Sequence, residues 1–167
     1  EVQAGLYRTA KRYSFEHFDL NPDLITVAKA LGGGLPLGGV IMAGEMTEVL
    51  KPGDHGSTFA PNPLALRGAR VVLEELEKME NSIAERGEYF LNKLKELDSE
   101  RIKEVRGIGL MLGIELTEEI PNLVDKAQAE GVLLNIVKDK VIRFLPALNI
   151  TKAEIDELVK KLEKILV

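Results

Sequence analysis

The sequence has no cysteine, no tryptophan and only two histidines, His17 and His55. Without cysteine there are no disulfides and no thiolate metal sites, and so few histidines argue against a histidine-built metal centre. No apolar run approaches the roughly 20 residues that cross a bilayer. No secretory or transit segment opens the sequence. We therefore expect a cytoplasmic protein with no metal and no membrane partner.

Positive charge is also not in excess, since 27 acidic residues outnumber 22 basic ones. The 167 residues carry a net charge of −5, which argues against nucleic acid as the main partner. Hydrophobic residues make up 45% and charged residues 29%, which is the balance of a folded soluble chain rather than a disordered one. The length suffices for one ordinary domain or slightly more.

The first third of the sequence has the pattern of an α/β layer. Two short apolar runs, 24–28 and 39–43, predict buried strands. Between them, the three glycines 32–34 and Pro36 require the backbone to turn. The stretch 51–63 is rich in turn-forming residues and predicts a loop.

A long helix is expected from Pro63, because apolar residues recur there at helical spacing. Asn81 and Ser82 interrupt that spacing and predict the N-cap of a second helix, which ends near residues 97–99. Downstream, the pattern predicts a strand at 111–116, a short helix at 121–131, a hairpin of 132–137 and 141–145, and a last helix whose capping box is Thr151 with Glu154.

These elements predict three parts. Residues 1–62 have the pattern of the end of a large α/β domain, and residues 63–97 form connecting helices. Residues 98–167 have the pattern of a small α+β domain.

Lys29 is the most informative candidate for chemistry. Lysine usually lies on a solvated surface, but Lys29 follows a predicted buried strand and precedes Gly32-Gly33-Gly34. In that position its side chain points into a cleft, where desolvation favours an uncharged amine that attacks carbonyl groups. The alternative is a strand-end lysine that reaches solvent.

Two other sites suit anions. The stretch His55-Gly56-Ser57-Thr58 offers hydroxyls and backbone N–H groups for a phosphate, and the alternative is an ordinary turn. Arg143 lies in an apolar strand, and its planar guanidinium suits a carboxylate bound by two hydrogen bonds. The alternative is an exposed strand arginine.

Several motifs together resemble, in order and spacing, the class-III (subgroup II) aminotransferases. They are Glu1-Val2-Gln3-Ala4-Gly5 with Arg8-Thr9, Lys29-Ala30-Leu31-Gly32-Gly33-Gly34, His55-Gly56-Ser57-Thr58-Phe59, Gly107-x-Gly109-Leu110 and Arg143-Phe144-Leu145-Pro146. Within this family the sequence is most similar to the acetylornithine and ornithine aminotransferases. It departs from the family pattern at Ala10 and at Ala60-Pro61, where glycines are usual.

The resemblance implies the C-terminal part of an aspartate-aminotransferase-like fold (fold type I) that binds pyridoxal 5'-phosphate (PLP). It implies that Lys29 forms the Schiff base with PLP and then moves the proton. It assigns Ser57 and Thr58 to the cofactor phosphate, Thr58 across a homodimer interface, and Gln3 to the pyridine 3-hydroxyl. Arg143 would bind the substrate α-carboxylate.

The reaction implied is amino transfer from N2-acetylornithine or ornithine to 2-oxoglutarate, in arginine biosynthesis. One alternative is an isomerase similar to glutamate-1-semialdehyde aminomutase, and another is a non-catalytic dimerisation piece. The family also has an aspartate directly before the position of Glu1, which pairs with the pyridinium nitrogen. Since the sequence starts at Glu1 without Met, we expect the chain to be part of an enzyme and inactive alone.

Overall fold

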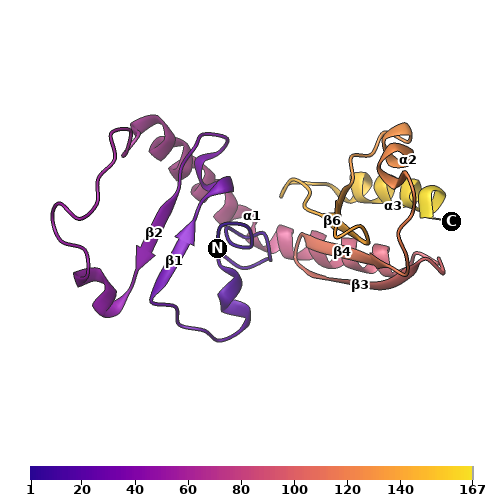
Figure 1. Cartoon of the computed structure of the whole chain (residues 1–167), viewed down its shortest axis with the longest axis horizontal. Coiled ribbons are helices and arrows are strands. Elements are labelled where there is room, and N and C mark those ends of the chain that lie inside the picture. The colour runs from indigo at the N-terminus through magenta and orange to yellow at the C-terminus, as the bar shows by residue number, and fades with distance from the viewer. Residues whose placement is uncertain (167) are drawn as a thin grey trace. The chain divides into compact units, whose positions relative to one another are not determined.

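The computed structural model describes residues 1–166 and divides into two units, Glu1–Glu80 and Asn81–Val167. The elements (Figure 1) are η1 (Ser14–His17), β1 (Leu24–Val27), η2 (Lys29–Gly32), β2 (Gly39–Met42), η3 (Gly44–Glu48), α1 (Pro63–Lys95), β3 (Ile102–Ile108), β4 (Met111–Leu116), α2 (Leu123–Ala129), β5 (Asn135–Val137), β6 (Val141–Phe144) and α3 (Lys152–Leu166). The boundary between the units falls within α1. The three-part division expected from the sequence stays a prediction.

In the first unit, β1 and β2 form a two-stranded antiparallel ribbon. Both strands were expected, but most of their side chains are not buried in this chain. Val27 is buried, whereas Leu24, Val40 and Ile41 are exposed by 46%, 58% and 42%. A ribbon of two strands has no neighbour to cover its faces, so the apolar runs determine the strands without determining their burial.

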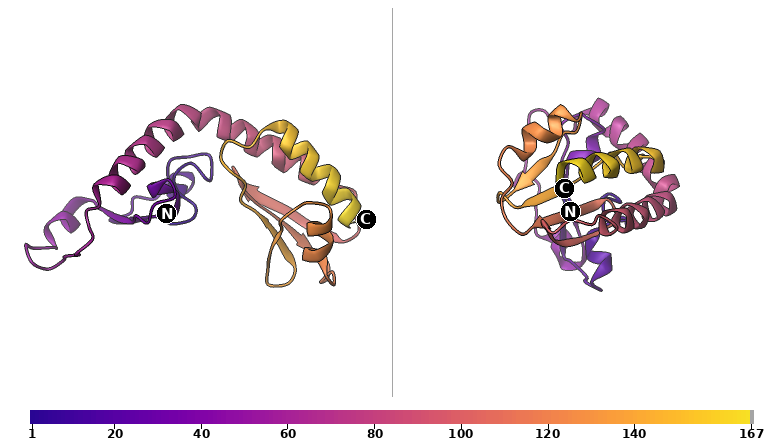
Figure 2. Two further views of the ribbon diagram at one scale, coloured as in Figure 1. Left: turned by 90° about the horizontal axis from the view of Figure 1, so that it is seen from above. Right: turned by 90° about the vertical axis from the view of Figure 1, so that its right-hand side faces the viewer.

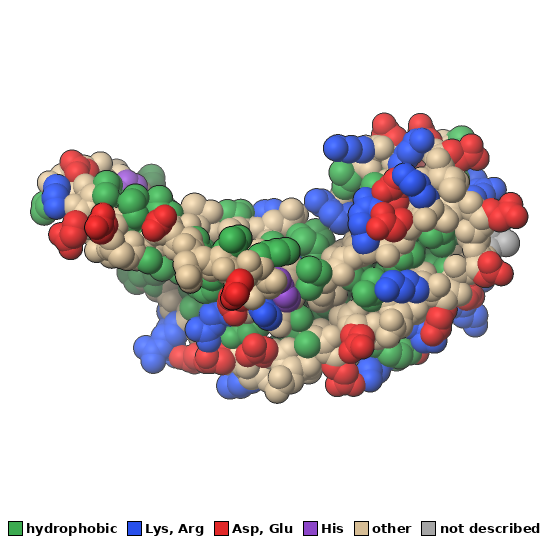
Figure 3. All heavy atoms as spheres, turned by 90° about the horizontal axis from the view of Figure 1, so that it is seen from below, with side chains coloured by type: hydrophobic (Ala, Val, Ile, Leu, Met, Phe, Trp, Pro, Cys, Tyr) green, Lys and Arg blue, Asp and Glu red, His purple; other side chains and the backbone are tan. Residues whose placement is uncertain are grey.

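Large hydrophobic side chains are exposed elsewhere in the first unit as well. Figure 3 shows hydrophobic side chains over the surface of this unit. The large exposed hydrophobic residues of this unit include Phe59 in the loop and Leu64, Leu66 and Val71 in the first turns of α1. An apolar surface of this kind is typical of a face that another protein segment covers.

In the second unit, four antiparallel strands form a sheet in the order β3-β4-β6-β5. Side chains of β4 alternate, with Leu112, Ile114 and Leu116 buried on one face. The C-terminal half of α1 and α3 cover that face (Figure 2). Phe90 of α1 contacts Phe144 of β6 edge to face, with ring centroids 5.4 Å apart, so the helices and the sheet share one core.

Helix α1 is continuous, and the interruption predicted at Asn81 and Ser82 is wrong. Ser82 does not cap a helix. Its hydroxyl accepts a hydrogen bond from Arg86 one turn later, at 3.1 Å. Ile83, next to Ser82, is fully buried. Packing on both sides of the polar pair therefore outweighs its weak helix propensity.

Strand β3 was not predicted. Its apolar residues Ile102, Val105 and Ile108 recur every third position, which is not the alternation of a regular strand. The pairing with β4 contains a register shift between Ile102 and Glu104. This β-bulge inserts one residue, which places Ile102 and Val105 on the same face of the sheet although they are three positions apart.

The C-terminal helix and the hairpin before it are confirmed. Thr151 and Glu154 form the predicted capping box, since the Thr151 backbone N–H donates to Glu154 Oε2 at 2.7 Å and the Glu154 N–H donates to Thr151 Oγ1 at 3.2 Å. Strands β5 and β6 pair around residues 138–140, although β5 begins at Asn135 rather than at residue 132. Over residues 1–166, no helix has both the length and the apolar composition needed to cross a membrane.

Candidate active site

Lys29 is the first residue of η2, two positions after the end of β1. Its φ angle of 47° lies in the left-handed region, which residues with a side chain rarely adopt. The side chain is exposed, so the expectation that it points into a cleft is wrong for the described part of the chain. Backbone strain of this type concentrates at functional sites, where the surrounding structure holds it in place.

Close contact with α1 supplies that support. A Cβ atom on Gly33, where φ is 60°, would lie 2.9 Å from Val72 Cγ2. A Cβ atom on Gly68 of α1 would lie 3.2 Å from the Gly32 carbonyl oxygen. The glycines after Lys29 therefore let the turn lie directly on the helix, which fixes the backbone that carries the amine.

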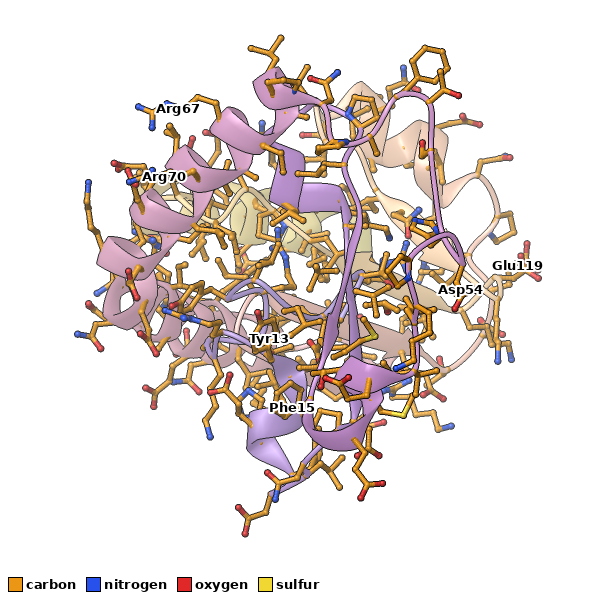
Figure 4. The ribbon with its side chains drawn as sticks, turned by 90° about the vertical axis from the view of Figure 1, so that its left-hand side faces the viewer. Tyr13, Phe15, Asp54, Arg67, Arg70 and Glu119 are labelled. Carbon is orange, nitrogen blue, oxygen red and sulfur yellow. The ribbon has the colours of Figure 1, made fainter. Side chains whose placement is uncertain are left out.

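Ser57 and Thr58 lie in the predicted loop, which has no regular structure. Both residues are exposed, and their hydroxyls form no hydrogen bond within the described part of the chain. A Cβ atom on the preceding Gly56 would meet nothing within 4 Å. Earlier in the loop, Asp54 (labelled in Figure 4) accepts a hydrogen bond from the Lys51 backbone N–H at 2.8 Å. The loop thus presents two free hydroxyls beside an open backbone.

Gln3 is exposed in the first segment of the chain. Glu1 ties this segment to η1, because its carboxylate accepts hydrogen bonds from the Ser14 backbone N–H at 2.8 Å, the Ser14 hydroxyl at 2.7 Å and the Phe15 N–H at 3.2 Å. Burial raises the pKa of the Glu1 carboxyl, but these hydrogen bonds outweigh it and hold the pKa below its ordinary value. Phe15 stacks on Tyr13 beside the tie (Figure 4).

Arg143 lies on β6 in the second unit and is half-buried. Its neighbours Ile142 and Phe144 are buried against the helices, so Arg143 projects on the opposite face of the sheet. It also borders a hollow of about 230 Å³ whose other walls are mostly apolar, including Leu134 and Leu145. Its Nε donates to Asn135 Oδ1 at 3.1 Å.

No carboxylate in the described part of the chain pairs with Arg143. The carboxylate nearest in the sheet register is Glu115, opposite Val141 on the same face. Glu115 is already held by Lys103 and Arg106, each at 2.6 Å. The hydrogen bond from Lys103, followed by that from Arg106, holds the pKa of Glu115 below its ordinary value. The terminal nitrogens of Arg143 therefore stay available to an external carboxylate.

The structure does not join all the predicted site residues. Gln3, Lys29, Ser57 and Thr58 belong to the first unit, and no hydrogen bond links them to one another among residues 1–166. Arg143 belongs to the second unit. Their roles remain predictions.

The sequence reasoning missed Asn135, the partner of Arg143. The signal was present, because a hairpin that turns at residues 138–140 pairs position 135 with position 143.

The chain matches the family described as Aminotransferase class-III over residues 1–166. It is 47% identical to the acetylornithine aminotransferase of Aquifex aeolicus and 43% identical to that of Methanocaldococcus jannaschii. These alignments cover 99% of this chain but only 43% and 42% of the relatives. The chain thus spans less than half the length of these relatives.

Solved structures agree. The chain superposes on the ornithine aminotransferase of Plasmodium yoelii with a TM-score of 0.91 and 37% identity, and on the acetylornithine aminotransferase of Elizabethkingia anophelis with a TM-score of 0.89 and 33% identity. Each superposition covers 99% of this chain, and they cover 46% and 44% of the two structures. The expected fold class, part of an aspartate-aminotransferase-like PLP-transferase fold, is therefore confirmed. The family match over nearly the whole described chain, together with these relatives, identifies the chain as a member of the class-III aminotransferases.

Proposed function

We propose that the native protein containing this chain is a PLP-dependent transaminase that moves an amino group from N2-acetylornithine or ornithine to 2-oxoglutarate, in arginine biosynthesis. The observation that carries the proposal is Lys29, an exposed amine on a strained turn that is braced by α1. The relatives support this choice of donor, since those at 47% and 43% identity are named acetylornithine aminotransferases and one at 42% is named ornithine aminotransferase. On the family resemblance, we also propose a homodimer in the cytoplasm.

The residues present fit PLP. The cofactor needs a primary amine for its aldehyde and hydrogen-bond donors for its phosphate. Lys29 supplies the amine, between small residues on an exposed turn, and the free hydroxyls of Ser57 and Thr58 supply donors. The exposed amide of Gln3 suits the pyridine 3-hydroxyl. When bound, PLP would withdraw electrons from the substrate carbon that carries the amine.

The chain's own side chains would do the rest. Lys29 Nζ would take the proton from the carbon of the donor that carries the amine, and would give a proton to the corresponding carbon of the acceptor when the acceptor receives the amine. Arg143 would hold the substrate carboxylate through two parallel hydrogen bonds and so set the orientation of that carbon. The close contact of the glycine turn with α1 holds the backbone that carries Lys29 during this movement.

Borohydride reduction of the PLP-loaded native protein tests the assignment of Lys29. We expect peptide mass analysis to find the cofactor fixed on Lys29, because reduction traps the bond between the amine and the aldehyde. In Lys29→Ala both the label and transamination should be lost. The matched control is Lys51→Ala, an exposed lysine of the same unit that should keep both. Labelling of a different lysine would overturn the assignment.

A kinetic comparison tests Arg143. Arg143→Lys keeps the charge but loses the planar fork, so we expect KM for 2-oxoglutarate to rise while kcat changes little. The loss of a charge-assisted pair of hydrogen bonds corresponds to roughly 2–4 kcal/mol of transition-state binding. An unchanged KM for every carboxylate substrate would mean that Arg143 binds none of them.

A further inference from the structure

We propose that Asn135 is a positioning residue for Arg143: its side-chain oxygen holds the guanidinium so that the two terminal nitrogens, rather than Nε, face the substrate carboxylate. This inference rests on the proposed role of Arg143. It assigns a function to a residue that does not itself touch the substrate.

Strand register makes Asn135 the cross-strand partner of Arg143. Asn135 on β5 lies directly opposite Arg143 on β6, and side chains of such a pair project on the same face with Cβ atoms about 5 Å apart. On the other side of β6 the opposite residue is Gly113 of β4, which has no side chain. The cross-strand position on β5 is therefore the one from which a side chain can hold Arg143.

Hydrogen-bond chemistry sets the orientation. Arg143 Nε–H can only donate, so the Asn135 atom that it contacts at 3.1 Å must be the amide oxygen. This bond removes Nε from competition for a carboxylate. Of the two forks that a guanidinium offers, the one between the terminal nitrogens remains open.

Charge explains why an amide serves here. A neutral acceptor orients the guanidinium without neutralising it. The carboxylate nearest in the register, Glu115, is held by Lys103 and Arg106 and does not pair with Arg143. An aspartate at position 135 would instead place a fixed negative charge beside the Arg143 guanidinium, where it would compete with the substrate carboxylate.

The test is steady-state kinetics on the PLP-loaded native protein, with KM and kcat measured for 2-oxoglutarate and its binding measured by calorimetry. Loss of one hydrogen bond to a charged group predicts that Asn135→Ala raises KM and Kd for 2-oxoglutarate about 10- to 150-fold, with kcat nearly unchanged. Asn135→Asp should raise both further, because its carboxylate competes with the substrate. Asn92→Ala, an exposed asparagine of the same unit, is the matched control and should change neither.

A double-mutant cycle separates this inference from the proposed function. In an Arg143→Ala background, Asn135→Ala should have no further effect, because the group that it positions is absent. If Arg143→Ala leaves KM and Kd unchanged, the role of Arg143 itself is refuted. If Arg143→Ala raises them but Asn135→Ala does not, or if the two effects add, Asn135 is not a positioning residue and the proposed function of Arg143 stands.

Discussion

Gly87→Ala puts two opposing effects in one helix position. Gly87 lies inside α1 and is buried. Helix propensity alone predicts that alanine stabilises an interior helix position by about 1 kcal/mol. However, a Cβ atom there would lie 2.6 Å from the carbonyl carbon and oxygen of Gly109 and 2.7 Å from its Cα. These are backbone atoms of the turn between β3 and β4, and they cannot rotate away.

The steric contact with Gly109 decides whether Gly87→Ala raises or lowers the free energy of unfolding. Overpacking usually costs about 1–3 kcal/mol, and a clash with backbone belongs at the upper end of that range. After the gain in propensity is subtracted, we expect Gly87→Ala to lower the free energy of unfolding by about 2 kcal/mol. The helix must move away from the turn, which also loosens the packing of Phe90, one turn further along α1.

Urea unfolding followed by circular dichroism measures this difference, provided that the m-value stays unchanged. Ala84→Gly is the matched control, since Ala84 is exposed in the same helix and reports propensity alone. It should cost about 1 kcal/mol. A Gly87→Ala protein as stable as the unmodified protein would refute the steric reasoning, and the control would show whether propensity was judged correctly.

Four further predictions concern the stability of separate regions. Phe90→Ala, at a fully buried site against Phe144, should cost about 3–5 kcal/mol in urea unfolding, whereas Phe59→Ala, at an 87% exposed site, should stay within about 0.5 kcal/mol. Thr151→Ala should cost about 1 kcal/mol through loss of the α3 cap. Hydrogen bonds from Thr151 lower the pKa of Glu154, so the contribution of Glu154 is present at neutral pH and is lost as the pH falls below about 4; Glu154→Gln should remove this pH dependence of the urea midpoint. In hydrogen exchange of residues 1–167, amides of β1 and β2 should exchange faster than those of β4, and equal protection would contradict the exposed ribbon.

Elements specified by neighbouring residues were predicted well. The α3 cap depends on Thr151 and Glu154, three positions apart, and both donate or accept within the same turn. The hairpin depends on three turn residues between two apolar runs. The turn after Lys29 was also expected, because consecutive glycines make the chain reverse without steric cost.

Elements that depend on contacts between residues distant in the sequence were predicted poorly. Helix α1 continues through Asn81 and Ser82 because residues on both sides of them pack into the structure. Strand β3 takes its form from its pairing with β4, and its bulge changes the spacing between Ile102 and Val105 from the alternation that identifies strands. Burial of β1 and β2 was predicted from their apolar side chains, yet burial depends on what lies against a strand.

The sequence by itself determined the family, because five short motifs in the right order identify it without a three-dimensional structure. It also determined Lys29 as the residue to test, through the glycines that follow it. Only the tertiary structure decided that this turn is braced by Gly68 and Val72 of α1, and that Asn135 rather than a carboxylate holds Arg143. Motifs and caps are local in the chain, whereas bracing and pairing join residues eight to about forty positions apart, and such contacts form only when the elements pack.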